Sequence, residues 1–363
     1  MRIFFALLGT VLCLSLEHSA AQVQGVPNEY KQAIEKSLSW LVKQQNNDGS
    51  WSNLQMQADV TSTGAAGLAL LMEGSTLTKG KYSKNVSQAV GWMVRNCREG
   101  ADDGRFGSNA REDPAGAMSG QSYAVLFLAC ALTREQKSEV KGFEARLARA
   151  RQQEMAGVLK RAVRFIVKAQ TKSGGWGLAP SQDYGNAGST IEQVLALRAA
   201  ELAGIEVPKE TMQKAYAYLK KVTTPRGGIT FSSEREGGER PGLTIAAFAA
   251  SYGSDQVGAD LLKKWLKFSQ YSIGPQSATQ DVFHLAIAVH GLGDAGYAKL
   301  FGTTEPGLVW SKARRMLLNR FRSEGGAIYR RWNPNPTFGT AISLIALQLD
   351  NDYLPVFRTK KNW

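Results

Sequence analysis

The chain has 363 residues, of which 44 are Lys or Arg and 31 are Asp or Glu, so its net charge is +13. With 43% hydrophobic residues, a chain of this length can bury an ample core without disulfides. After the first residues no run lacks charge for long enough to span a bilayer, which excludes an integral membrane protein. The basic residues are scattered and accompany no nucleic-acid-binding module, so nucleic acid is not an expected partner. They are typical of a solvated helix exterior, or of attraction to an anionic envelope surface such as lipid or acidic polysaccharide.

The N-terminus has the pattern of a signal peptide, predicted to cover residues 1–21. Arg2 gives it a positive start, residues 3–16 are apolar but too few to span a bilayer, and small residues at 19–21 suit cleavage. The sequence therefore predicts an exported protein, periplasmic or secreted.

A motif that joins a helix to a sharp turn occurs twice, in residues 38–51 and 163–177. In each copy an amphipathic helix ends in Gln, and a Gly-Trp turn follows. Glycine adopts backbone angles that other residues avoid, the Gln can tie one helix end to the next helix, and the Trp packs over the junction. We interpret these residues as structural and not catalytic: Gln45, Gly49, Trp51, Gln170, Gly175 and Trp176.

Similar amphipathic helices recur along the chain, each marked by a large apolar residue. These markers are Trp40, Trp92, Phe165, Tyr218, Trp265 and Leu317. They are separated by 47 to 53 residues, except for a gap of 73 before Phe165. The longer gap contains a charged stretch near 134–157, which predicts an inserted helix or loop that is exposed to solvent.

A second series of helices alternates with the first and is rich in Ala, Gly and Leu, with little charge on any face. It covers residues 61–72, 119–132, 189–203, 243–252, 278–290 and 338–349. Helices without a polar face are enclosed by other elements. Six such pairs predict an all-α fold, an (α/α)6 toroid in which six inner and six outer helices form a double ring, as a single domain over residues 22–363. An open solenoid would need polar capping repeats at both ends, whereas the first repeat is the best formed.

These repeats resemble those of the prenyltransferase and squalene-cyclase superfamily, which includes terpenoid cyclases and protein prenyltransferases and whose members fold as α/α toroids. The resemblance rests on the two copies of the motif and on weaker copies at 103–107, 227–231 and 325–329. Stretches at 174–177, at 195–208, and at 340–347 together with 353–358 are similar to exported bacterial toroid proteins of unsettled function. The resemblance implies a ring with a central pocket.

The catalytic motifs of toroid enzymes are not matched. Squalene-hopene cyclases protonate an alkene with an Asp-x-Asp-Asp cluster, and the nearest stretch, 350–353, reads Asp-Asn-Asp-Tyr. Protein prenyltransferases hold zinc with Asp, Cys and His, a set that does not align with this chain. The Gly-Cys-Gly-Glu-Gln motif of complement-type thioester domains is also missing, since residues 96–99 read Asn-Cys-Arg-Glu. Enzyme activity is therefore left open, and no cofactor is expected.

One metal site deserves consideration because Asp281 and His284 are three residues apart on one inner helix. Both could reach one ion, with Cys130 of another inner helix as a third ligand. We favour a hydrogen-bonded Asp–His pair instead, so no metal is expected. Cys130 lies in an apolar run typical of a buried thiol, and a disulfide with Cys97 is the alternative.

Polar residues at or near the starts of the inner helices could line the mouth of a central cavity. They are Asp59, Gln121, Tyr123, Asp183, Glu192, Asp281 and His284. Glu192 and Asp281 could serve as an acid/base pair on a polysaccharide, as in other α/α toroids. The simpler interpretation is that these residues cap helices.

The sequence thus favours an exported, non-catalytic protein of the cell envelope. It would bind an apolar ligand, a lipid or isoprenoid, or interact with an anionic surface of the envelope. The alternative is a toroid enzyme with an unrecognised active site. That enzyme would be a terpenoid or lipid cyclase or transferase, or a carbohydrate-active enzyme that uses Glu192 and Asp281.

Overall fold

The computed structural model describes residues 28–107, 117–137, 141–234, 237–270, 272–301, 313–319 and 335–357. The predicted signal peptide, residues 1–21, lies outside the described residues. No helix in the described ranges is long and apolar enough to cross a membrane. The strands that the structure describes are the short pair β1 (Trp51–Ser52) and β2 (Ala58–Asp59).

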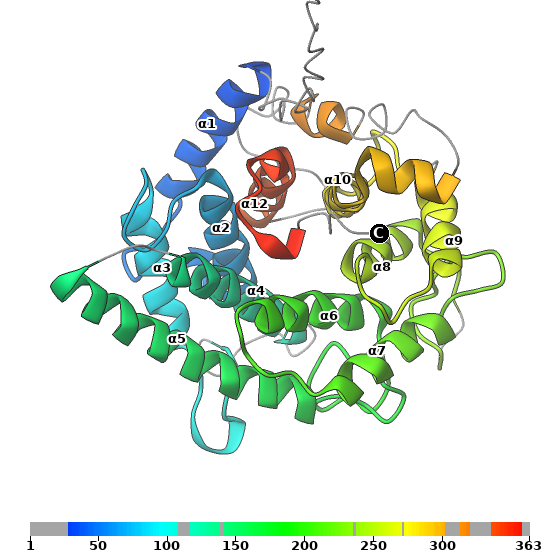
Figure 1. Cartoon of the computed structure of the whole chain (residues 1–363), viewed down its shortest axis with the longest axis horizontal. Helices are drawn as coiled ribbons and strands as arrows, with labels where there is room; N and C mark the ends of the chain where they lie inside the picture. Colours follow the sequence, from blue (N-terminus) through cyan, green and yellow to red (C-terminus); the bar gives the residue numbers. More distant parts are fainter. Residues whose placement is uncertain are drawn as a thin grey trace, which may run out of the picture.

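Apolar helices form an inner ring, and each begins within two residues of its predicted start (Figure 1). They are α2 (Val60–Glu73), α4 (Ala117–Gln136), α6 (Ala187–Leu202), α8 (Pro241–Ser251), α10 (Thr279–Phe301) and α12 (Pro336–Leu347). Small residues let these helices approach closely, because a Cβ added at Gly64 of α2 would lie 2.7 Å from the Tyr123 carbonyl oxygen of α4. α10 runs past its predicted end because a kink at Gly293 (φ 60°) joins it to a second helical stretch.

Amphipathic helices form the outer ring around them. They are α1 (Asn28–Lys43), α3 (Ser83–Arg95), α5 (Gly142–Lys168), α7 (Lys209–Lys221), α9 (Ala259–Gln270) and the helical residues 313–319. Their marker residues face the core: Trp92, Tyr218, Trp265 and Leu317 are buried, and Trp40 and Phe165 are partly buried against the same core. The predicted all-α toroid of inner and outer helices is confirmed.

The ring is closed by contacts between its first and last inner helices, α2 and α12. Asn335 Nδ2 donates a hydrogen bond of 2.7 Å to Ser62 Oγ, near the starts of both helices. At the other end, Gln348 Nε2 donates to the Ala69 carbonyl oxygen (3.1 Å) and Asn351 Nδ2 donates to that of Met72 (2.9 Å). A closed ring has no exposed terminal repeat, which explains why no polar capping repeat is needed.

We expect Gln348→Ala to lower the free energy of unfolding by about 1–3 kcal/mol, because it removes a buried hydrogen bond that joins the two ends of the ring. Urea unfolding of the purified chain measures this change. Gln44→Ala is the matched control, since the Gln44 amide is exposed and bonds only the preceding helical turn. Equal stability of the two variants would mean that the closing bond contributes nothing.

The two copies of the sequence motif form the same junction. Trp51 Nε1 donates to the Leu41 carbonyl oxygen at 2.8 Å, and Trp176 Nε1 donates to that of Ile166 at 2.7 Å. The Gln of each copy bonds both the turn and the following outer helix: Gln45 Nε2 reaches Gly49 and Asn85, and Gln170 Nε2 reaches Gly174 and Thr211. These contacts hold consecutive hairpins together, as a structural role requires.

The glycines of the motif meet two different demands. Gly49 and Gly174 have φ of +98° and +92°, a region that side chains rarely adopt. Gly175, the other predicted turn glycine, does not have positive φ. It lies against α6, where a Cβ would be 2.8 Å from Thr190 Oγ1. Gly175 is therefore needed for close packing and not for backbone freedom.

The charged stretch near 134–157 does not form a separate segment in its described part. It comprises the last turn of α4 and the first half of α5, whose 27 residues exceed the 12 to 16 of α1, α3, α7 and α9. The extra residues thus lengthen one outer helix. Cys97 and Cys130 are both buried and unpaired.

Candidate functional site

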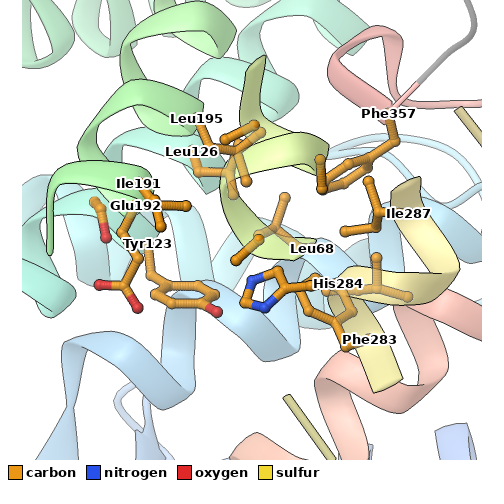
Figure 2. A pocket seen from close by; sticks show the side chains of 15 residues that line it. Leu68, Tyr123, Leu126, Ile191, Glu192, Leu195, Phe283, His284, Ile287 and Phe357 are labelled. Carbon is orange, nitrogen blue, oxygen red and sulfur yellow. The ribbon is translucent and has the colours of Figure 1, made fainter. Parts of the chain in front are cut away.

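A narrow pocket lies on the axis of the ring, because all six inner helices contribute to its wall (Figure 2). The space open to the centre of a water molecule is about 20 Å³, room for one or two waters. Leu68, Leu126, Ile191, Leu195, Phe283, Ile287 and Phe357 give it a largely apolar lining. The titratable side chains that line it are Tyr123, Glu192 and His284.

These three polar residues share one level of the ring. Tyr123 is in the second turn of α4, Glu192 in the second turn of α6 and His284 in the second turn of α10. Figure 2 shows the Tyr123 ring between the Glu192 carboxyl and the His284 imidazole. The residue three positions later in each helix, Leu126, Leu195 and Ile287, also lines the pocket. A polar layer is therefore followed by an apolar layer one helical turn further along the three helices.

Glu192 keeps its proton up to near-neutral pH, where an ordinary carboxyl group is fully ionised. Burial raises the pKa of its carboxyl from 4.5 to about 7, and a side-chain hydrogen bond with Ser119 opposes this shift only in part. Part of the side chain remains open to the pocket, but the surrounding helices exclude bulk water, which would otherwise stabilise the carboxylate. Glu192 is thus a proton donor whose pKa lies near neutrality.

His284 has the opposite tendency and stays uncharged. Burial lowers the pKa of its imidazole from 6.5 to about 4, with no contribution from Asp281. Its ring centroid lies 5.1 Å from that of Phe283. A neutral imidazole has one nitrogen with a free lone pair, so it can accept a proton or a hydrogen bond in the pocket.

Tyr123 contributes a phenol that stays protonated. Burial, and next the charge of Glu192, raise the pKa of its hydroxyl well above 10. Its ring packs edge-on against Phe338 of α12, with centroids 5.3 Å apart, which fixes the phenol in place. The hydroxyl is therefore a positioned hydrogen-bond donor.

Three residues predicted at the cavity mouth lie elsewhere. Asp59 caps α2, since its Oδ2 accepts from the Ser62 backbone N–H at 2.7 Å. Gln121 is buried and holds the turn before α4: its Oε1 accepts from Phe106 N (2.9 Å) and its Nε2 donates to the Gly104 carbonyl oxygen (2.9 Å). Asp183 is exposed in the loop before α6. None of the three lines the axial pocket.

Asp281 also lies outside the pocket wall. Its carboxylate fills the space beside Gly242 in the first turn of α8, where a Cβ on the glycine would collide with Asp281 Oδ1. A carboxylate at this place is favoured by the partial positive charge of a helix N-terminus. Of the alternative acid/base pair Glu192 and Asp281, only Glu192 lines the pocket.

The structure also does not group the side chains that were considered as alternative metal ligands, Asp281, His284 and Cys130, into a metal site. Among the described residues, no three His, Cys, Asp or Glu side chains are grouped so that they could hold a metal ion. Cys130 is buried within α4, and burial raises the pKa of its thiol to about 12, which disfavours the thiolate that zinc requires.

Solved structures with a similar fold include glycosidases. A glycosidase variant in complex with glucose matches with a TM-score of 0.58 and 11% identity, over 90% of this chain and 98% of that chain. A glycosidase variant with a glutamate replaced by alanine matches with a TM-score of 0.55, at the same identity and coverage. No protein-family model and no curated protein matches the chain. At this identity the likeness shows the helical ring fold alone.

Proposed function

We propose that the protein is a carbohydrate-active enzyme that cleaves a glycosidic bond in the axial pocket, with Glu192 as the general acid. The observation that carries this proposal is a carboxyl group with a pKa of about 7 that faces the pocket. Glycoside cleavage needs a proton on the leaving oxygen, and a buried carboxylic acid that is still protonated near neutrality supplies it. Because residues 1–21 are predicted to be a signal peptide, we propose that this activity takes place outside the cytoplasm.

The acid strength of Glu192 argues against terpenoid cyclisation. Protonation of an alkene needs an unusually strong acid, whereas burial makes Glu192 a weaker acid than an ordinary carboxyl group. A weak acid of this kind suits an acetal oxygen, which carries lone pairs and accepts the proton as its bond to carbon breaks. The resemblance to squalene-cyclase and prenyltransferase repeats therefore applies to the helical ring and not to the reaction.

His284 and Tyr123 complete the proposed site. The neutral imidazole of His284 can accept a proton from the water that attacks the sugar, in place of the second carboxylate that Asp281 would have supplied. The Tyr123 hydroxyl can donate a hydrogen bond to a sugar oxygen. The glycosidases of similar fold support the proposal because two of them are variants in which a glutamate was replaced by alanine.

The size and lining of the pocket restrict the substrate. About 20 Å³ is too small for a sugar ring, so a lining side chain such as Leu195 must move aside before the sugar reaches Glu192. The apolar layer formed by Leu126, Leu195 and Ile287 suits an apolar group attached to the sugar. The same apolar wall favours a second candidate function, the binding of a lipid or isoprenoid without catalysis.

A panel of nitrophenyl and octyl glycosides tests the proposal. We expect Glu192→Gln to lower kcat/KM for octyl glycosides by about 10²- to 10⁴-fold. The octyl alkoxide is a poor leaving group, so its oxygen must be protonated as the glycosidic bond breaks. The loss should be much smaller for nitrophenyl glycosides, since nitrophenolate leaves without one. For the wild type, kcat/KM for octyl glycosides should fall above pH 7, where Glu192 loses its proton.

Glu201→Gln is the matched control, because Glu201 is on the same helix but exposed. A loss that is equal for both leaving groups would contradict general acid catalysis by Glu192. Should the wild type turn over none of the glycosides yet bind a fluorescent fatty-acid probe, the second candidate function would be favoured. Loss of probe binding in Leu195→Trp, which fills the apolar layer, would place that ligand in the axial pocket.

A further inference from the structure

The first half of α5 projects beyond its neighbours in the ring. Gln152 Nε2 donates to the Glu135 carbonyl oxygen at 3.0 Å, which places Gln152 level with the end of α4. Residues 142–151 therefore extend past that end, over about 15 Å for ten helical residues. Figure 1 shows the start of α5 at a corner of the outline. We call residues 142–151 the α5 extension.

The α5 extension exposes apolar side chains that a purely structural helix would bury. Phe143 is 69% exposed and Leu147 39% exposed. They are four residues apart, so they lie on the same face, one turn from each other. On the side of the extension that faces the protein, the buried residue Ala148 has a small side chain. An exposed aromatic residue with a leucine beside it can insert into an apolar phase, and its surroundings decide whether it does.

Basic residues accompany this apolar pair. Arg146 and Arg149 are exposed on the extension, and Lys141 precedes it. Over its full length α5 has seven Lys and Arg against two Glu. Arg151, Arg161 and Arg164 form ion pairs with Glu135 or Asp103, and Lys160 and Lys168 are exposed along the rest of the helix. The helix therefore carries a positive outer face that ends in an apolar tip.

We propose that the α5 extension docks on an anionic lipid surface, with Phe143 and Leu147 inserted between head groups and Arg146 and Arg149 on their phosphates. Charge alone would also fit an acidic polysaccharide. A polysaccharide offers no apolar phase, however, so it would leave Phe143 and Leu147 in water. A lipid interface satisfies both the charge and the apolar pair. This docking does not depend on the reaction in the axial pocket.

Co-sedimentation of the full chain with lipid vesicles tests the proposal. We expect the protein to bind phosphatidylcholine vesicles that contain phosphatidylglycerol, and not vesicles of phosphatidylcholine alone. Phe143→Ser with Leu147→Ser should lower the partition coefficient about tenfold, through lost apolar insertion. Arg146→Gln with Arg149→Gln should lower it by a similar factor, and high salt should weaken binding of the wild type.

Two control pairs match the number and type of residues changed. Leu54→Ser with Met56→Ser alters apolar residues that are 45% and 83% exposed in the loop before α2. Lys264→Gln with Lys267→Gln removes two exposed charges from α9. Both pairs should bind like the wild type. The proposal would be overturned if the wild type bound neutral and anionic vesicles equally well. It would also be overturned if the variant without Phe143 and Leu147 bound like the wild type, or if the control pairs lost as much binding as the α5 variants. All changes are on the surface, and circular dichroism serves to check that each variant folds.

Discussion

Replacing Glu192 by Gln should raise the free energy of unfolding by about 3 kcal/mol above pH 7 and leave it unchanged below pH 4.5. The carboxyl group loses its proton near pH 4.5 in the unfolded chain but only near pH 7 in the folded one. Between these values the folded protein retains a proton that the unfolded chain has released. Stability of the wild type therefore falls as the pH rises through this window. Gln cannot ionise, so the variant escapes the loss.

Urea unfolding of both proteins across the pH range measures this effect. The pKa of His284 is lowered to about 4, so burial of His284 makes both proteins less stable as the pH falls from 6.5 towards 4. This second effect cancels in the difference between wild type and variant. Glu206→Gln, which alters an exposed side chain, should show no such pH-dependent gain. A difference between Glu192→Gln and wild type that does not grow with pH would mean that Glu192 is ionised in the folded protein.

Together with the activity experiment, this result separates two roles of Glu192. A residue retained for stability should not lower the stability of the protein at neutral pH. A gain in stability with a loss of octyl glycoside cleavage is the trade-off expected of a buried catalytic acid. A gain in stability without any change in turnover or ligand binding would remove Glu192 from the proposed site.

Trp176→Ala should lower the free energy of unfolding by about 4 kcal/mol. The indole is fully buried, and its removal leaves a cavity at the junction of α5 and α6. It also removes the 2.7 Å hydrogen bond to the Ile166 carbonyl oxygen, which then lacks its indole donor at the end of α5. Thermal and urea unfolding measure the loss.

Two further variants separate the contributions of Trp176. Trp176→Phe keeps most of the bulk but not the hydrogen bond, so we expect a loss of about 1–2 kcal/mol. Trp40→Ala should cost less than Trp176→Ala, because Trp40 is only partly buried. Trp176 does not line the axial pocket, and the pKa of Glu192 should stay near 7 in all three variants. A Trp176→Ala protein that melts like the wild type would contradict the structural role of the motif.

The sequence was informative about the site only in part. Tyr123, Glu192 and His284 were predicted near the cavity, and they do line the axial pocket. Gln121, two residues before Tyr123, instead faces the turn at Gly104 and Phe106, and Asp281, three residues before His284, packs against α8. Each residue turns a helix by about 100°, so close neighbours in sequence face different directions. The positions of the helix starts in the sequence could not reveal which side chains point towards the axis of the ring.

The apolar part of the pocket was not predicted, although the sequence holds a signal for it. Leu126, Leu195 and Ile287 each follow one of the three polar residues by three positions. Because the inner helices run in the same direction, equal offsets lie at equal depth. Phe357 has no such signal, because it comes from the short helix Pro355–Phe357 after α12 and reaches the pocket only through tertiary packing.

The sequence by itself determined the ring. Two copies of a Gln-Gly-Trp junction, six apolar helices and six amphipathic ones predict an α/α toroid, because the period of a helix and the needs of a tight turn are local properties of the chain. Only the tertiary structure decided the chemistry of the centre. The proton on Glu192 and the neutral imidazole of His284 arise from burial, which depends on what all six inner helices place around each group, and no local pattern contains that information.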